Sequence, residues 1–378
     1  MRDLKRPFVL LCLGLVLSLS VQTARGQSAA SQPWSKEKAD AWYQAQGWLV
    51  GSNFAPSTAI NQLEMWQADT FDPETIDREL GWAEQLGFNT MRVFLHNLLW
   101  EQDPQGFVDR IDQFLTIADR HGIRPMFVLF DSVWDPFPHL GKQRAPKPHI
   151  HNSGWVQSPG VAIISDTSRY DELEGYVKGV IGRFRNDDRV ALWDMFNEPD
   201  NDNRPAYYVF EPNNKGELAL ILLKKAYGWA REVDPSQPIT SAPWHGDWSD
   251  PDHLSPMDDF MLHNSDVITF HSYNDLETVK QQVAALKQYG RPLICTEYMA
   301  RPTGSTFQAI LPFFKEQNVG AYNWGFVSGK TQTIYPWDSW YKEYSAEPAL
   351  WFHDIFRKNG APYDPKEVQL IKSLTGKR

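Results

Sequence analysis

The stretch RVALWDMFNEPDN (residues 189–201) begins as an apolar run and ends in Asn197, Glu198 and Pro199. An apolar run of this length is typical of a buried strand, whereas asparagine and proline favour turns. A strand that ends in a turn would account for the run and the proline. It would not account for the carboxylate at the strand end, so the rest of the chain decides how Glu198 is interpreted.

Seven further apolar runs alternate with amphipathic helical segments. Helix signals are clear in three of these segments: residues 72–87 begin with Asp72 as a cap and Pro73 in the first turn, and residues 107–122 and 276–290 end on glycine. Eight strands that alternate with helices predict an α/β fold, a (β/α)8 TIM barrel in a single domain. The predicted strands cover residues 47–54, 88–96, 123–130, 189–198, 238–244, 266–273, 291–298 and 319–326.

The start of the chain has a composition of its own. Residues 1–6 are basic, residues 7–21 are almost wholly apolar, and the small residues Ala24 and Gly26 follow. This pattern predicts a signal peptide over residues 1–26, because the apolar run is shorter than the roughly 20 residues of a spanning helix. We therefore expect an exported protein, periplasmic or extracellular, with a helical lead-in over residues 27–46 and the catalytic barrel over residues 47–378.

Composition excludes several classes of function. The net charge is −10 and no basic patch is present, so nucleic acid is not an expected partner. The chain lacks a G-x-S-x-G elbow and a phosphate-binding glycine loop. His149 and His151 form an H-x-H pair without a third ligand of matching type, so we expect no metal and no cofactor. Once the signal peptide is removed, Cys295 is the only cysteine, which rules out an internal disulfide. We expect a monomer.

Two glutamates stand at the ends of predicted strands. Barrel enzymes place their chemistry at the carboxyl ends of the strands. Glu198 ends the fourth strand and Glu297, in ICTEYMAR, ends the seventh, so both carboxylates are expected to face one mouth of the barrel. Glycoside hydrolysis requires such a pair, one group to protonate the leaving oxygen and one to attack or to activate water.

Tryptophan is unusually frequent, with 16 residues beside 14 tyrosines and 21 phenylalanines. Several tryptophans lie near strand ends or in the long loops over residues 131–160 and 327–348, where an indole face can stack on a sugar ring. These are Trp134, Trp155, Trp244, Trp248, Trp337 and Trp340.

Five motifs arrive in order on successive strands, and together they resemble a known family. They are Arg92 in NTMRVF, FNEP at the end of the fourth strand, HSY with His271 and Tyr273, Glu297, and Trp324 in YNWGF. The chain is similar in these motifs to the clan of retaining (β/α)8 glycoside hydrolases, and most similar to the cellulase-like family 5. The resemblance covers residues 48 to about 359.

The resemblance implies a role for each matched residue. Glu198 would be the general acid/base and Glu297 the nucleophile. Arg92 would keep Glu297 ionised, Asn197 would bind the sugar 2-hydroxyl, and Trp324 would form the platform beneath the sugar. Further substrate-binding residues are then expected at the strand ends: His271, Tyr273, Asp131, Asn53, His96 and Trp244. Asp131 departs from the family, since many relatives carry histidine there.

The implied activity is that of a retaining β-glycosidase, an O-glycosyl hydrolase that acts on a β-linked oligo- or polysaccharide of plant or microbial origin. The choice among glucan, mannan and xylan stays open. Alternatives also stay open for single residues, because Arg92 could be a salt-bridge residue inside the barrel and Trp324 could simply pack. For the whole chain, the alternatives are a non-catalytic carbohydrate-binding barrel and a transglycosylase with the same site.

Overall fold

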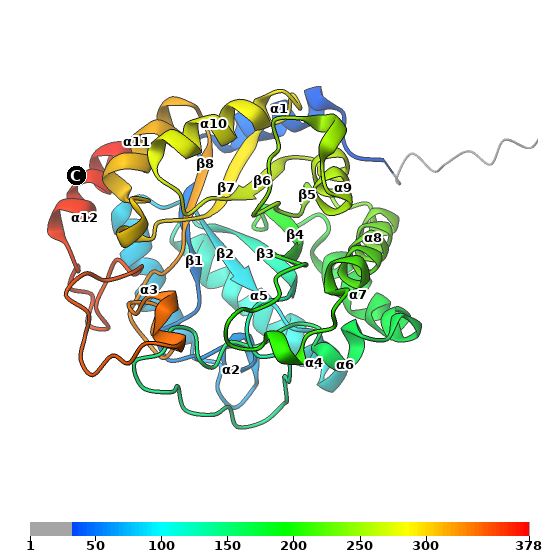
Figure 1. The fold of residues 1–378 in the computed structure, drawn as a ribbon, viewed down its shortest axis with the longest axis horizontal. Helices are drawn as coiled ribbons and strands as arrows, with labels where there is room; N and C mark the ends of the chain where they lie inside the picture. Colours follow the sequence, from blue (N-terminus) through cyan, green and yellow to red (C-terminus); the bar gives the residue numbers. More distant parts are fainter. Residues whose placement is uncertain (1–31, 378) are drawn as a thin grey trace, which may run out of the picture.

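The computed structural model describes residues 32–377, and the predicted signal peptide lies outside the described residues. Eight parallel strands form one sheet in the order β5-β4-β3-β2-β1-β8-β7-β6. The strands are β1 Val50–Phe54, β2 Thr90–Phe94, β3 Arg124–Asp131, β4 Leu192–Asn197, β5 Ile239–Thr240, β6 Ile268–His271, β7 Leu293–Tyr298 and β8 Gly320–Asn323. All eight lie inside or within one residue of the predicted ranges, so the predicted (β/α)8 barrel is confirmed (Figure 1).

A helix follows each strand and packs on the outside of the sheet (Figure 1). The predicted helix start at Asp72 is confirmed, since its side chain accepts a hydrogen bond from Thr75 N and Gly87 ends the helix at φ +75°. The helices are α1 Lys36–Gln46, α2 Gln62–Trp66, α3 Pro73–Leu86, α4 Asn97–Gln102, α5 Pro104–Arg120, α6 Val161–Ile164, α7 Glu174–Phe184, α8 Lys215–Val233, α9 Pro256–Asn264, α10 Leu276–Lys287, α11 Phe307–Glu316 and α12 Pro365–Thr375.

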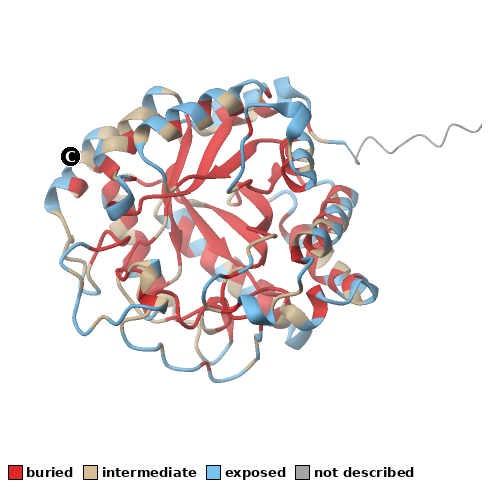
Figure 2. Ribbon diagram, viewed as in Figure 1, coloured by how far each residue is buried: buried red, intermediate tan, exposed pale blue. Residues whose placement is uncertain are grey.

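Burial separates the two faces of the long outer helices. The strands are buried except at the partly buried Arg124, while the long outer helices expose one face and bury the other (Figure 2). The buried faces and the outward side chains of the strands form one large apolar cluster. A second cluster at the amino ends of the strands includes Leu49, Met126 and Tyr322, and α1 covers it with Ala39 and Tyr43. None of the described helices is long and apolar enough to cross a membrane.

The barrel closes imperfectly between β5 and β6, which share no ladder. β5 is shorter than predicted because Pro238 and Pro243 flank it and cannot donate to a ladder. Single backbone bonds and side chains close the gap instead. Asp266 N donates to Ile239 O at 2.9 Å, Ile239 N donates to Asp266 Oδ2 at 2.8 Å, and the hydroxyls of Thr240 and Thr269 lie 2.8 Å apart. The carboxyl ends of all eight strands thus stay gathered around one mouth.

Candidate active site

A cavity of about 390 Å³ opens among the carboxyl ends of the strands. This volume is near the lower end of the roughly 300–1,000 Å³ that ligand pockets have. Three segments supply most of its wall: the β3 loop (residues 132–160), the β4 loop (198–214) and the β8 loop (324–364). Six of the residues predicted from the sequence line it, namely Asn197, Glu198, Trp244, Tyr273, Glu297 and Trp324.

Glu297 reaches the cavity through an irregularity in β7. Phe270 pairs with Cys295, but the next residue, His271, pairs with Glu297, so β7 carries one extra residue at this point. Such bulges re-aim a side chain and are frequent beside active sites. The Glu297 carboxylate is only 5% exposed as a residue and accepts hydrogen bonds from Arg92 Nη1 at 2.8 Å and from the Tyr273 hydroxyl at 2.7 Å.

Arg92 lies completely buried beneath the two carboxylates, in the middle of the barrel. All five of its N–H groups donate hydrogen bonds. Nε and Nη2 bind Asp194 Oδ2 at 3.0 and 2.8 Å, and the others bind Asn53 Oδ1, Glu297 Oε1 and Asn197 Oδ1 at 2.7 to 2.9 Å. A planar guanidinium can satisfy this many fixed acceptors at once, whereas the ammonium of lysine has three donors.

Glu198 takes an unusual backbone conformation at the end of β4, with φ +41°. A non-glycine residue at positive φ is uncommon and is often found at functional sites. The carboxylate lies between two partners: His271 Nδ1 is 2.9 Å from Oε1, and Asn201 Nδ2 donates to Oε2 at 2.6 Å. The turn after the strand therefore points Glu198 at β6 and β7.

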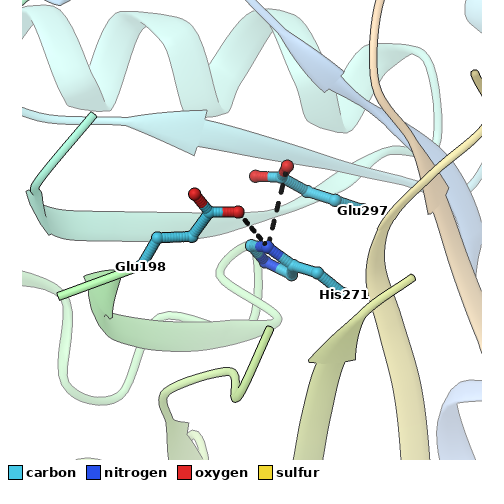
Figure 3. A group of neighbouring side chains, drawn as sticks. All are labelled: Glu198, His271 and Glu297. Carbon is cyan, nitrogen blue, oxygen red and sulfur yellow. Dashed lines mark hydrogen bonds and ion pairs between the residues drawn. The ribbon is translucent and has the colours of Figure 1, made fainter. Parts of the chain in front are cut away.

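The two glutamates approach each other closely. Figure 3 shows both carboxylates directed toward the ring of His271, whose Nδ1 is 2.9 Å from Glu198 and 3.7 Å from Glu297. One oxygen of each carboxylate and this nitrogen all lie within 4.8 Å of one another. A divalent cation could use the same three donor atoms. However, Arg92 and Tyr273 already bind the oxygens of Glu297. The two carboxylates and His271 are therefore better suited to transfer a proton and to stabilise positive charge that develops on a substrate.

The β3 and β8 loops bind each other across the mouth, and we call this contact the loop bridge. In the sheet, β1 and β2 lie between β8 and β3, so the bridge spans that side of the barrel. Trp134 stacks on Trp340 within it, with ring centroids 5.3 Å apart. Backbone N–H groups of the β3 loop supply its hydrogen bonds: His149 to Gln332 Oε1 at 2.8 Å, His151 to Ser339 Oγ at 3.0 Å and Asn152 to Thr331 O at 2.8 Å.

Three residues predicted to bind substrate have other contacts in the structure. Asp131 is 1% exposed and accepts from Asn197 Nδ2 at 3.0 Å and from Trp155 Nε1 at 2.6 Å, so it holds the Asn197 amide instead of reaching the cavity. His96 is fully buried, and its ring nitrogens contact Gln157 O and Leu98 N at the start of α4. Protein groups surround both side chains, and neither lines the cavity, so direct contact of Asp131 and His96 with sugar stays a prediction.

Asn53 also acts from behind the site. Its Oδ1 accepts from Arg92, and its Nδ2 donates to the carbonyls of Thr296 and Asn323 at 2.8 and 3.2 Å. Asn53 thus fixes Arg92, and direct contact with substrate is not indicated.

Four of the seven tryptophans that the sequence offers for stacking on sugar line the cavity, namely Trp134, Trp244, Trp324 and Trp337. Trp324 packs edge-to-face against Phe94 and Trp155, with centroids 5.8 and 6.0 Å apart, and it also lines the cavity. It therefore packs as the alternative interpretation expected, and its role as a platform beneath the sugar stays a prediction. Trp244 lies at the other side, where its Nε1 donates to Asp200 Oδ1 at 2.7 Å.

A family comparison agrees with this geometry. Residues 152–356, more than half of the chain, match the family described as "Glycosyl hydrolases family 2, TIM barrel domain". The chain belongs to this family. The matched segment of the family 2 barrel runs from the β3 loop through Glu198 and Glu297 into the β8 loop. The predicted resemblance to TIM barrel glycoside hydrolases is therefore confirmed.

Curated relatives and solved structures extend the comparison. A β-glucuronidase of Felis catus is 27% identical over 219 residues, which is 54% of this chain and 30% of the relative. The chain thus spans under a third of the length of that relative. Among solved structures, GH5_18 from Streptomyces cattleya in complex with GlcNAc has a TM-score of 0.59 at 13% identity and covers 88% of this chain and 80% of its own. The exo-β-1,4-mannosidase Op5Man5 from Opitutaceae bacterium strain TAV5 has a TM-score of 0.57 at 18% identity and covers 87% and 59%. These likenesses show the fold.

Burial raises the pKa values of Glu198 and Glu297, the two glutamates at the mouth of the family 2 barrel. It raises the pKa of Glu198 to about 7, although the hydrogen bond from Asn201 works against this rise. It also raises the pKa of Glu297, where the charge of Arg92 and the hydrogen bond from Tyr273 oppose the rise. Only Glu297 touches the guanidinium directly, so we expect it to lose its proton first. Burial lowers the pKa of His271 to about 4, which leaves this ring neutral at pH 7.

Several residues of this site were not predicted as members of it, and three of them bear on its chemistry or its closed end. Asn201 binds Glu198 and lies three positions after it within the stretch NEPDN, so its position was a usable signal. Asp194 binds Arg92 and is a carboxylate in the middle of an apolar strand, which is also a visible anomaly. Asn152 lines the cavity from a long loop, and no local pattern points to it.

The pH dependence of turnover follows from the environment of Glu198. If Glu198 donates the proton, kcat/KM should fall as pH rises through about 7, because the carboxyl is then ionised. Asn201→Ala removes a hydrogen bond that favours the ionised form of Glu198 and so raises its pKa. The alkaline limb of the profile, where kcat/KM falls, should therefore move to higher pH. The pH profile of kcat/KM on a glycoside with a poor leaving group measures both effects. A limb that does not move in the variant would contradict the assignment.

Proposed function

We propose that this chain is a retaining, exo-acting β-glycosidase that releases a neutral sugar from the non-reducing end of a β-linked glycan. The observation that carries the proposal is the separation of the two carboxylates, whose facing oxygens lie within 4.8 Å. Retaining enzymes hold their carboxyl groups about 5–5.5 Å apart, whereas inverting enzymes leave about 6.5–9.5 Å for a water. The short separation favours direct attack by one glutamate.

The surroundings of the glutamates divide the two roles. Glu297, bound to Arg92 and Tyr273, is the ionised group that attacks the anomeric carbon. Glu198, whose pKa is raised to about 7, donates its proton to the leaving oxygen. Once the glycosyl-enzyme bond has formed, the negative charge of Glu297 is gone. Glu198 can then ionise and take a proton from the water that attacks the intermediate, which returns both groups to their starting states.

Exo action is supported by the shape of the cavity. The loop bridge closes the side over β1 and β2, and the lining residues there, Trp134, His151 and Asn152, are buried. The exposed lining residues, Arg204 and Trp337 among them, lie on the rim formed by the β4 and β8 loops. A cavity that is closed at one end accepts the end of a glycan more readily than its middle.

The charges around the cavity favour a neutral sugar. Among the lining residues, Arg204 is the only lysine or arginine. Its side chain is 73% exposed and is paired with Asp202 at 2.9 Å, which places it on the rim. Among the described residues that line the buried end, none is a lysine or arginine that could bind a sugar carboxylate, so the lining does not favour a glucuronide, the substrate that the name of the curated relatives indicates.

Glucan, mannan and xylan ends all remain possible donors, and a sugar in place of water in the second step would give transglycosylation. The two catalytic groups with their supporting Arg92, Asn197 and Tyr273 argue against a barrel that only binds carbohydrate. From the basic and apolar start of the chain we also propose export from the cytoplasm.

The products test this proposal. The purified protein is offered 4-nitrophenyl β-glycosides of glucose, galactose, mannose, xylose and glucuronic acid, and then β-linked oligosaccharides of the preferred sugar. We expect release of single sugars from the non-reducing end, little activity on the glucuronide, and a β-anomer as the first product in proton NMR. An α-anomer would overturn the retaining mechanism, and a ladder of intermediate lengths would overturn exo action.

A further inference from the structure

The closed end of the cavity contains a buried amide that lacks a partner. Asn152 is 1% exposed and lines the catalytic cavity as well as a small neighbouring cavity beside Trp324. Its side-chain oxygen Oδ1 is buried and accepts no hydrogen bond from the described part of the chain. A buried acceptor without a donor is destabilising, so a native protein normally pairs it with its own groups, with water or with a ligand.

The backbone holds this amide in place. Asn152 N donates to Thr331 O at 2.8 Å, and Asn152 O accepts from Trp155 N at 3.0 Å. The residue has φ +46°, in the left-handed region that asparagine, aspartate and glycine tolerate better than other residues. Of these three, asparagine alone offers a neutral acceptor. The position is thus fixed independently of any ligand, with its acceptor free.

The location of Asn152 relative to the glutamates indicates which part of a sugar it meets. Asn152 belongs to the loop bridge, at the buried end of the cavity that also contains Glu198 and Glu297. In a pyranose ring, C4 lies across the ring from the anomeric C1. A sugar that rests on Trp324 with C1 at Glu297 therefore directs its 4-hydroxyl away from the glutamates and toward the closed end.

We propose that Asn152 determines specificity by accepting a hydrogen bond from the 4-hydroxyl of the terminal sugar. The inference rests on the proposed function and adds the residue that binds the sugar at C4, opposite the anomeric carbon. A 4-hydroxyl that donates to this buried oxygen cannot carry another sugar. The same contact therefore selects the sugar and excludes internal residues of a 1,4-linked chain.

Deoxy substrates test the contact directly. The preferred 4-nitrophenyl β-glycoside is compared with its 4-deoxy and 2-deoxy forms in the wild type, in Asn152→Gly and in Asn152→Asp. Glycine removes the acceptor and tolerates the positive φ, while aspartate keeps an acceptor in the same backbone conformation. The 2-deoxy form is the matched control, because the 2-hydroxyl is expected at Asn197.

In the wild type we expect removal of the 4-hydroxyl to lower kcat/KM about tenfold or more. Asn152→Gly should lose a similar factor on the parent glycoside and show almost no further loss on the 4-deoxy form. Asn152→Asp should keep the dependence on the 4-hydroxyl, and the effect of 2-deoxygenation should be the same in all three proteins. The proposal would be overturned if Asn152→Gly lowered kcat/KM by the same factor, relative to the wild type, on the parent glycoside and on the 4-deoxy glycoside. General damage to the site would then explain the loss.

A binding measurement separates this inference from the proposed function. Titration calorimetry with methyl β-glycosides is carried out on Glu297→Gln, with and without Asn152→Gly, and does not depend on turnover. The contact is supported if Glu297→Gln binds the 4-deoxy glycoside more weakly than the parent glycoside, while the variant that also carries Asn152→Gly binds the two equally. This result would hold even if the wild type hydrolysed nothing. Equal affinity of Glu297→Gln for the two glycosides, or no binding of either, would overturn the contact.

Discussion

Glu297→Gln and Glu198→Gln are each expected to lower kcat/KM on the natural glycan at least about 10³-fold, as the loss of a nucleophile or a general acid does in other enzymes. The amide has the shape of the carboxyl, and both residues lie in hydrogen-bonded, buried positions, so the fold should be unchanged by circular dichroism. Glu79→Gln is the matched control. Glu79 is equally buried, but its carboxylate binds Ser57 away from the cavity, and this variant should keep full activity.

The two glutamates should also fail in different ways. With azide added, Glu297→Gly should yield a glycosyl azide of the opposite anomeric configuration, because azide attacks in place of the missing nucleophile. Glu198→Ala with an activated aryl glycoside should yield an azide of retained configuration, since Glu297 still forms the intermediate. If both variants gave the same anomer, the division of roles between Glu198 and Glu297 would be wrong.

Arg92→Met should cause the second large effect, a loss of about 3–5 kcal/mol in the free energy of unfolding together with a loss of activity. The substitution leaves the carboxylates of Asp194 and Glu297 in a buried site without their cation. The pKa of Glu297 should rise further, so that fewer molecules carry an ionised nucleophile. Denaturant unfolding and kcat/KM, measured well below the melting temperature, report the two effects separately.

A second buried arginine provides the control for Arg92. Arg231 forms two hydrogen bonds with Asp266, at 2.8 and 2.7 Å, near the amino end of β6 and away from the cavity. Arg231→Met should cost a comparable amount of stability and leave kcat/KM almost unchanged in the folded protein. A similar loss of activity in both variants would mean that Arg92 acts only by supporting the fold.

The barrel was predictable because its signals are local. Each strand is a short apolar run, and each helix begins or ends at residues such as Asp72 and Gly87 whose preferences do not depend on distant contacts. The ends of strands were less predictable. Residues 238–244 read as one strand, but only Ile239–Thr240 pair, because the flanking prolines lack the N–H that a ladder requires.

The candidate site was predictable only in part, from the rule that barrel enzymes place their chemistry at the carboxyl ends of the strands. That rule places Glu198 and Glu297 at one mouth, but it says nothing of the extra residue in β7 that aims Glu297 or of the positive φ of Glu198. The same rule does not place Asp131 and His96 at the cavity. Asp131 ends β3 and His96 caps α4 two residues after β2, and the β3 loop folds back and covers both with the Trp155 indole N–H and the Gln157 carbonyl.

The loop bridge has a consequence for the order in which the protein folds. His149 and Gln332 are 183 positions apart, and His151 and Ser339 are 188 apart. Contacts between such distant segments carry a large loop-closure entropy and form slowly unless other structure has already brought the segments together. Pairing of β1 with β2 and with β8 does this, so we expect the bridge to assemble after the barrel. A chain at that earlier stage already has both glutamates at the ends of paired strands. They face an open groove, so we expect the proposed selectivity for chain ends to arise only in the last step of folding.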